Sequence, residues 1–432
     1  MERIFLGLDK PPLHAAVDYI VQSCRDGDSL DLSQLVFVMP GARASRRLTE
    51  LLFERAQELS LKFLPGEITT TGNVPELLYE PKRPFATDWV QQLSWSWAIR
   101  NTVPSVRDRV FPAIPADAQK EWSIESWLQL GRLLRRCYRE LAAEGLSFAD
   151  VVEAGPQLDD FTEEGRWTAM ATIQEEYLRM LDGRNLWDRQ TARLVAVEQQ
   201  ECHTAKRLVL IGTSDLNRII RSMLEQVGDS VTTLVAAPES WSALFDSCGC
   251  VRPAAWADVE IPLEEDQLIV ADNISDQSNA VVKAMASLEG KWTRDQITIS
   301  CPDAELVPYI QRSLATHDIN GRWGIGRNIQ QSGPYQLLEI MCEWLRTNRF
   351  DAFAVLVRHP DVDQWLLDKG VKLGWLNELD NYRNDHLPVH TNGKWLGAIK
   401  RRERLEQVWQ HISGLRKPLQ KPVAALSEWA DC

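Results

Sequence analysis

The sequence lacks the features that mark several large classes of protein. Its eight cysteines are scattered along 432 residues without a CxxC pair, which argues against a disulfide framework and against the usual zinc-binding spacings. No apolar run is long enough to cross a bilayer, and the N-terminus has no basic stretch followed by an apolar signal segment. These absences favour a soluble, cytoplasmic protein with reduced thiols, no membrane partner, and neither a metal nor another cofactor in this chain.

Positive charge is also in short supply. Lys and Arg number 48 against 61 Asp and Glu, so the formal net charge is −13. Such a surface disfavours nonspecific binding to nucleic acid, and any contact with DNA must come from local basic patches or from a basic partner. The length of 432 residues, with 44% hydrophobic residues, is enough for two or three separate cores.

The chain is organised around residues 207–238, which read as a strand, a polar turn, an amphipathic helix and a second strand. The apolar run 208–211 is short and continuous, as in a parallel strand covered on both faces. Ligands of parallel α/β sheets bind at the carboxyl ends of the strands, here the turn from Gly212 to Asp215. An α/β enzyme that binds a small molecule or nucleotide at this turn is one open hypothesis, and a protein-interaction module is another.

The first strand, at residues 3–7, leads into a helix through a turn that reads GLDKPPLH. This is where a nucleotide-binding protein carries GxxxxGK[ST], whose glycines and lysine cradle phosphates. Only Gly7 is present, two prolines remove backbone donors, and no Ser or Thr follows Lys10. We therefore expect a plain strand-to-helix connection rather than a working phosphate loop.

Two further turns carry groups that suit a phosphate backbone. A buried strand at residues 35–39 precedes a helix with three arginines in its first turns, where cations oppose the helix dipole and indicate an anionic partner. A strand at residues 67–71 ends in hydroxyl and amide side chains, which could hold phosphates or merely cap the next helix. A solvated basic face is an equally good interpretation of the arginines. The candidate contacts are Gly41, Arg43, Arg46, Arg47, Thr70, Thr71 and Asn73.

Strand signals stop between residues 84 and 187, where helical periodicity predicts an inserted helical domain rich in tryptophan. Core packing accounts for most of these tryptophans, although exposed ones could stack on unpaired bases. A one-sided basic stripe, which we call the arginine stripe, consists of Arg132, Arg135, Arg136 and Arg139. Nearby glutamates could neutralise it, so a solvated face is favoured over a DNA track.

The remainder predicts a second α/β set and a helical end. Strands are expected at residues 268–271 and 296–300, with helices at 277–288 and 305–317. The full division is a first α/β domain at 1–83 and 188–245, a helical insert at 84–187, a connection at 246–266, a second α/β domain at 267–335, and a helical domain at 336–432.

Several segments together resemble superfamily 1, UvrD-like helicases, and more closely the AddB-type subunit of bacterial AddAB helicase–nucleases. LVFVMPGARASRRLTELL and ITTTGNVPELLY are similar to helicase segments that touch single-stranded DNA, and RLVLIGTSDLNRII is similar to the strand that carries the metal-site acids in active motors. Ile211 and Gly212 stand where the magnesium-binding Asp and the catalytic Glu belong, whereas Asp215 keeps the final acid of that segment, and is a further candidate contact for DNA. Cys301 stands where a phosphate-sensing Arg is expected.

The resemblance implies an N-terminal portion of such a subunit, with two P-loop NTPase-type motor domains of degenerate sequence and inserted helical domains. Gly7, Lys10, Ile211, Gly212 and Cys301 would then mark a degenerate nucleotide site. Because phosphoryl transfer depends on placed charges that are missing here, no ATPase activity is expected. The implied function is a catalytically inactive scaffold that binds single-stranded DNA, together with an AddA-like helicase–nuclease subunit, in DNA repair and recombination at double-strand breaks.

Overall fold

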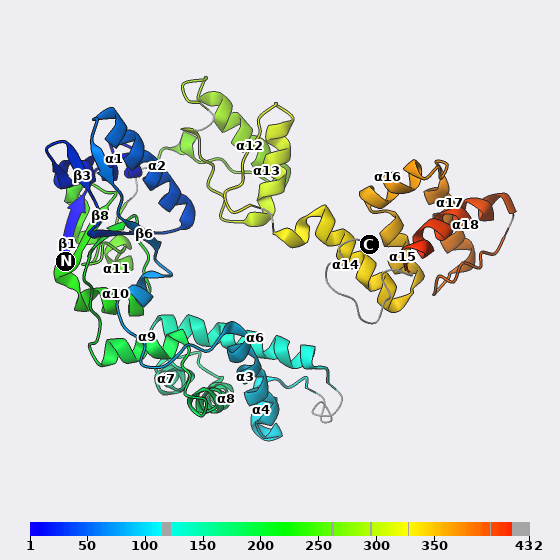
Figure 1. Ribbon diagram of the computed structural model, residues 1–432, viewed down its shortest axis with the longest axis horizontal. Helices are drawn as coiled ribbons and strands as arrows, with labels where there is room; N and C mark the ends of the chain where they lie inside the picture. Colours follow the sequence, from blue (N-terminus) through cyan, green and yellow to red (C-terminus); the bar gives the residue numbers. More distant parts are fainter. Residues whose placement is uncertain (115–121, 261–262, 294–295, 327, 398, 417–432) are drawn as a thin grey trace. The chain divides into compact units, whose positions relative to one another are not determined.

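The computed structural model describes residues 1–432 except 115–121, 261–262, 294–295, 327, 398 and 417–432. The chain divides into two compact units, Met1–Ile261 and Pro262–Cys432, and each is described by itself (Figure 1).

A parallel five-stranded sheet forms the centre of the first unit, with strand order β1-β8-β7-β4-β6. The strands are β1 (Glu2–Phe5), β4 (Leu35–Met39), β6 (Glu67–Thr70), β7 (Arg207–Ile211) and β8 (Val231–Val235). Every residue of β4 is buried, as is every residue of β7 after its first, because helices cover both faces of these central strands. The expected α/β class with a parallel sheet is therefore confirmed for this unit.

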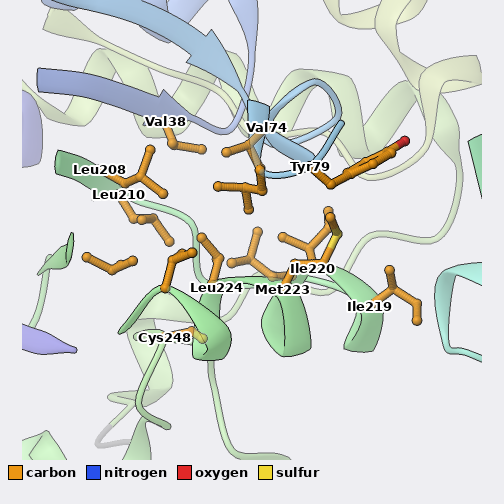
Figure 2. Packing of buried hydrophobic residues seen from close by; sticks show 14 of the residues in the cluster. Val38, Val74, Tyr79, Leu208, Leu210, Ile219, Ile220, Met223, Leu224 and Cys248 are labelled. Carbon is orange, nitrogen blue, oxygen red and sulfur yellow. The ribbon is translucent and has the colours of Figure 1, made fainter. Parts of the chain in front are cut away.

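Alternate side chains of β4 supply two different cores. Phe37 packs with the helices α1 (Pro12–Cys24) and α2 (Ala42–Glu58) on one face. Val38 packs on the other face with α9 (Arg189–Glu198) and α10 (Arg218–Gln226). Figure 2 shows this second core, in which Ile220, Met223 and Leu224 of α10 lie against Leu208 and Leu210 of β7. Their helical spacing is the signal that predicted α10.

β4 and β7 are parallel neighbours in the sheet, and the order in which strands are added reverses between them. From β4 the chain crosses through α2 to β6 at one edge, whereas from β7 it crosses through α10 to β8 on the other side. The two crossover helices cover opposite faces, so the carboxyl ends of β4 and β7 flank a topological switch point. A small second sheet, which the sequence did not predict, contains β2 (Arg25–Asp26), β3 (Ser29–Asp31) and β5 (Lys62–Leu64).

The insert between β6 and β7 is helical, as expected, and closes at a narrow neck. Its main helices are α3 (Asp88–Asn101), α4 (Pro104–Val110), α6 (Ile124–Ala143), α7 (Phe148–Ala154) and α8 (Glu164–Asp182). The neck is a parallel bridge between Phe85 and Trp187, where the Ala86 N–H donates to the Trp187 carbonyl at 2.8 Å and the Trp187 N–H donates to the Pro84 carbonyl at 3.1 Å. Both ends of the insert therefore leave the α/β part at one point.

A buried carboxylate, Asp188, ties the insert to α9. It accepts hydrogen bonds from the Tyr177 hydroxyl at 2.7 Å, the Tyr138 hydroxyl at 3.4 Å and the Thr191 N–H at 2.7 Å, while being 0% exposed. Burial, followed by the negative charge of Asp188, raises the pKa of both tyrosines, so they remain donors. The Tyr177 ring in turn stacks on Trp95 with 4.3 Å between ring centroids.

Most of the segment expected as a connection, 246–266, belongs to the first unit, which ends at Ile261 and contains the short helix α11 (Pro253–Trp256). The Asp246 carboxylate accepts from the N–H groups of Cys248 and Cys250 at 2.9 and 2.8 Å, and both cysteines are buried in the core of α10. Figure 2 shows Cys248 in this core. Burial raises the pKa of the Cys248 thiol to about 12 and that of Cys250 to about 11, so neither forms a thiolate readily. Because Cys248 and Cys250 pack in this core, the chain around them is part of the first unit and not a free linker.

The second unit corrects the prediction of another parallel sheet. Residues 268–271 and 296–300 run as irregular chain, and no strand is assigned in the described residues of this unit. Val270 is 94% exposed and Leu268 and Ile269 are each 61% exposed, so the apolar run that suggested a strand remains mostly on the surface. Two short strands alone do not form a stable sheet, which is a physical reason for the outcome. A second motor domain is thus not seen.

Helices make up the regular structure described in this unit. They are α12 (Ile274–Ser287), α13 (Val307–Ala315), α14 (Gly333–Thr347), α15 (Phe350–Val357), α16 (Pro360–Asp368), α17 (Trp375–His386) and α18 (Ile399–Gly414). From α14 onward they share a core around Trp344, Phe353 and Trp375. In the described parts of the whole chain, no helix combines the length and apolar character needed to cross a membrane. Within the same residues, no cluster of three or more His, Cys, Asp or Glu side chains is placed to hold a metal ion.

Candidate nucleic-acid interface

Three glycine turns lie along the carboxyl edge of the sheet. Gly212 follows β7, Gly41 follows β4 and Gly72 follows β6, and these three strands are parallel neighbours. The Thr71 N–H donates to the Met39 carbonyl at 3.0 Å, which ties the Gly72 turn to the end of β4. The three turns therefore share one edge of the sheet, and contact of these turns with DNA stays a prediction.

Within the first unit, two of the degenerate nucleotide residues, Gly7 and Lys10, are engaged by other groups of the protein. The Gly7 N–H donates to the Ala237 carbonyl at 3.1 Å, so it extends the pairing of β1 with β8 instead of pointing at a ligand. Lys10 forms an ion pair with Asp18 at 2.7 Å. β8 separates β1 from β7, so Gly7 does not follow a neighbour of the strand that ends at Ile211. Cys301 lies in the second unit, where its thiol donates to the Asp303 carbonyl at 3.0 Å.

We therefore expect no saturable binding of Mg-ATP at micromolar concentrations by the full chain. The lysine that would meet a phosphate is paired with Asp18, the Gly7 N–H is used in the sheet, and Pro11 and Pro12 remove two backbone donors from the turn. Isothermal titration calorimetry with the wild type and Lys10→Ala is the measurement. Saturable heat in the wild type that disappears in the variant is the result that contradicts this expectation.

The arginines at the start of α2 differ in their surroundings. Arg47 lies 3.0 Å from Glu50 and 3.6 Å from Glu54, so its charge is directed along its own helix. Arg43 and Arg46 are exposed and form no ion pair with a described residue. Asn73 bonds within its own turn, through its N–H to the Thr70 carbonyl at 2.9 Å and its side-chain amide to the Thr70 hydroxyl at 3.4 Å. Two of the three arginines, Arg43 and Arg46, thus remain available to an anion.

A groove of about 570 Å³ lies where the helical insert meets the α/β part of the first unit. Its lining comes from α6, α9 and the N-terminal end of α10, and we call it the arginine groove. The lining residues are Arg132, Arg135, Arg136, Arg139, Glu140, Ala143, Gln190, Arg193 and Asn217. The arginine stripe of α6, which sequence reasoning treated mainly as a solvated face, therefore forms one wall of a concave site.

The arginine groove reaches the carboxyl edge of the sheet at two points. The Arg193 guanidinium binds Glu76 in a two-pronged fashion, with both hydrogen bonds 2.8 Å long, and also donates to the Gly72 carbonyl at 3.3 Å. Asn217 ends the turn after β7 and caps α10 by accepting from the Ile220 N–H at 3.0 Å. The groove thus borders the turns after β6 and β7, although the groove and the turns were separate candidates in the sequence.

The charge of the arginine groove is positive in a chain whose net charge is −13. Five arginines line it against Glu140, and counting Glu76 and Asp88 as further partners leaves 5 − 3 = +2. Arg136 pairs with Glu140 at 3.0 Å, and Arg135 pairs with Asp88. The hydrogen bond from Arg135, then its charge, holds the pKa of Asp88 below its ordinary value, so this partner stays ionised near neutral pH.

Two arginines of the groove, Arg132 and Arg139, form no ion pair with any residue that the structure describes. They are the groups most ready to receive a phosphate. Sequence reasoning missed Arg193, Gln190 and Asn217, because a single arginine or amide on a helix gives no periodic signal and only the tertiary fold brings them to the α6 stripe.

No protein-family model matches the chain, and no curated protein matches it. The fold and the groove alone define the class: a parallel α/β domain with a helical insert, whose switch-point edge adjoins a basic groove.

Proposed function

We propose that this chain is a catalytically inactive, helicase-like scaffold that binds single-stranded DNA through the arginine groove. The observation that carries the proposal is the convergence of five arginines on one concave surface that opens at the carboxyl edge of the sheet. Arginine forks hydrogen-bond phosphate oxygens without reading bases, so such a groove suits a nucleic-acid backbone.

The absence of catalysis follows from the groups at the strand ends. Phosphoryl transfer requires a lysine on the phosphates and acids on magnesium. Here Lys10 is held by Asp18, and Ile211 and Gly212 occupy the end of β7 where acids are needed. The chain is therefore proposed to contribute binding to a complex rather than chemistry.

The resemblance to AddB-type subunits supports a place in the processing of double-strand breaks, beside an AddA-like helicase–nuclease subunit. In such a complex the partner would supply ATP hydrolysis, and this chain would hold one strand. The net charge of −13 makes the free chain a weak binder at physiological salt, so the partner would also strengthen the contact.

A second candidate is a small-molecule or nucleotide site at the turn from Gly212 to Asp215. One observation favours it: Thr213 is only 4% exposed, and its hydroxyl has no hydrogen-bond partner among the described residues. Buried polar groups normally have partners, so a ligand at this turn would satisfy the hydroxyl. Calorimetric titration with nucleotides, before and after Thr213→Val, separates this candidate from the scaffold.

The test of the scaffold is a salt titration of binding to a labelled single-stranded oligonucleotide, measured by fluorescence anisotropy with the full chain from low salt upward. Each phosphate contact contributes about −0.7 to the slope of log affinity against log salt. The triple variant Arg132→Gln, Arg136→Gln and Arg139→Gln should therefore flatten the slope by about two units.

A matched control removes the same charge from the same insert, in Arg166→Gln, Arg179→Gln and Arg184→Gln. These residues lie on or just after α8 and outside the arginine groove. The control should keep the wild-type slope. Equal slopes in the two triple variants would refute the arginine groove as the DNA site, and the same titration with Arg43→Gln and Arg46→Gln would then test the start of α2.

A further inference from the structure

The helix α3 exposes an aromatic stripe on the surface of the helical insert. Trp89 is 68% exposed, Leu93 46% and Trp97 50%, and their spacing of four residues puts them on one face. The Arg100 guanidinium lies over the Trp97 ring, 5.6 Å from its centroid. Trp95 and Trp127 of the same domain are buried and belong to the core, so exposure separates the two kinds of tryptophan.

This aromatic stripe shares the outer face of the insert with the arginine stripe. α3 and α6 are close neighbours: Gln92 donates to the Leu128 carbonyl at 3.3 Å, and Arg135 donates to the Gln91 side chain at 3.2 Å. Both helices bury their inner faces in one core, which contains Trp95 and Ile99 of α3 and Trp127 and Leu134 of α6.

The helices run in opposite directions, because Arg135 contacts Asp88 whereas Gly131 approaches Ser96. Each step along a right-handed helix rotates the side chain by about 100°. In an antiparallel pair, the residue one position after an inter-helix contact therefore lies on the same face of the pair in both helices. Trp89 and Trp97 follow contact residues of α3, and Arg132 and Arg136 follow contact residues of α6. The rings and the guanidinium groups therefore line one surface.

We propose that Trp89 and Trp97 stack on unpaired bases of the strand whose phosphates lie along the arginine groove. This inference rests on the proposed function and adds the groups that hold the bases. Aromatic rings beside a basic track are the usual means of binding a single strand without sequence preference, since every base has a π-face. The neighbouring arginines favour a polyanion over an apolar protein surface as the occupant of the stripe.

The test compares two probes with the same number of phosphates: an oligothymidylate and an abasic oligonucleotide of equal length. Stacking on two rings should make the wild type prefer the oligothymidylate by about tenfold or more. The double variant Trp89→Leu and Trp97→Leu should bind both probes equally, with the salt slope of the wild type, because the phosphate contacts remain. Trp89→Phe and Trp97→Phe should keep most of the preference.

Trp292→Leu, at a half-exposed tryptophan of the second unit, is the control and should behave as the wild type. The inference is overturned if the Leu variant keeps the preference, or if the wild type binds both probes equally with a steep salt slope; in the second case the arginine groove still stands. If the wild type binds neither probe, the proposed function fails as well.

Discussion

Replacing Asp188 with alanine is expected to accelerate amide hydrogen exchange in α8 and α9 about a hundredfold. The carboxylate is the shared acceptor for Tyr177, Tyr138 and the Thr191 N–H, and it is 0% exposed. Its removal leaves the buried Tyr177 hydroxyl without an acceptor, leaves the Tyr138 hydroxyl with only the Thr191 hydroxyl at 3.5 Å, and takes away the N-cap of α9. Together these losses amount to about 3 kcal/mol, which corresponds to two orders of magnitude in the population of the open state.

Exchange measured by mass spectrometry on the full chain reports each helix separately, so the second unit serves as an internal reference. Asp150→Ala is the matched control, because Asp150 is also part of an N-cap, that of α7, but is exposed. It should change exchange in its own helix by about tenfold or less. Unaltered protection of α8 and α9 in Asp188→Ala would show that this junction does not stabilise the insert.

The second large effect is expected at Gly131, where α6 passes closest to α3. A Cβ at this position would lie 2.3 Å from the Ser96 hydroxyl oxygen, 3.0 Å from the Ser96 backbone nitrogen and 3.1 Å from the Gln92 carbonyl oxygen. The serine hydroxyl can rotate away, but the two backbone atoms cannot. Gly131→Ala should therefore lower the free energy of unfolding by about 2 kcal/mol, although alanine is the better helix former by about 1 kcal/mol.

Urea unfolding followed by circular dichroism measures this change in the full chain. Gly165→Ala, in the first turn of α8, supplies the control, since the nearest atom to its added Cβ is an Arg109 nitrogen at an ordinary 3.7 Å. That variant should be as stable as the wild type or slightly more so. A stabilised Gly131→Ala protein would mean that α3 and α6 can separate without loss.

The sequence predicted correctly those strands whose two faces are both buried, because burial on both faces gives a continuous apolar run. β4 has the predicted bounds of 35–39, and the strand, turn and helix after residue 207 were all identified, because continuous apolar runs bounded by polar turns are specific to central parallel strands. The runs at 268–271 and 296–300 carried the same local signal. The two strand predictions were wrong because a strand also needs neighbouring strands with which to pair, and local sequence does not show whether such neighbours exist.

The candidate site was predicted in pieces and assembled only by the fold. Local spacing identified the α6 stripe, and among the glutamates weighed as partners Glu140 does bind Arg136. Asp88, 47 residues away from Arg135, and Glu76, 117 residues away from Arg193, could not be found from spacing. The link from the groove to the Gly72 turn rests on the second of these distant contacts, through Arg193.

The neck at Phe85 and Trp187 has a consequence for how the protein folds. β4 must find β7 across most of the first unit, from residue 35 to residue 207, and such closure is slow for a flexible chain. If the insert folds first, its neck brings residues 84 and 187 together. The residues of the insert then no longer count toward the loop that must close when β4 pairs with β7. The entropic saving grows only with the logarithm of loop length, about 0.6 kcal/mol per doubling. The larger benefit is kinetic: with the insert already folded, only the segments outside the neck, residues 71–84 and 187–206, connect β6 to β7, so β4 can pair with both strands after closure of a much shorter loop.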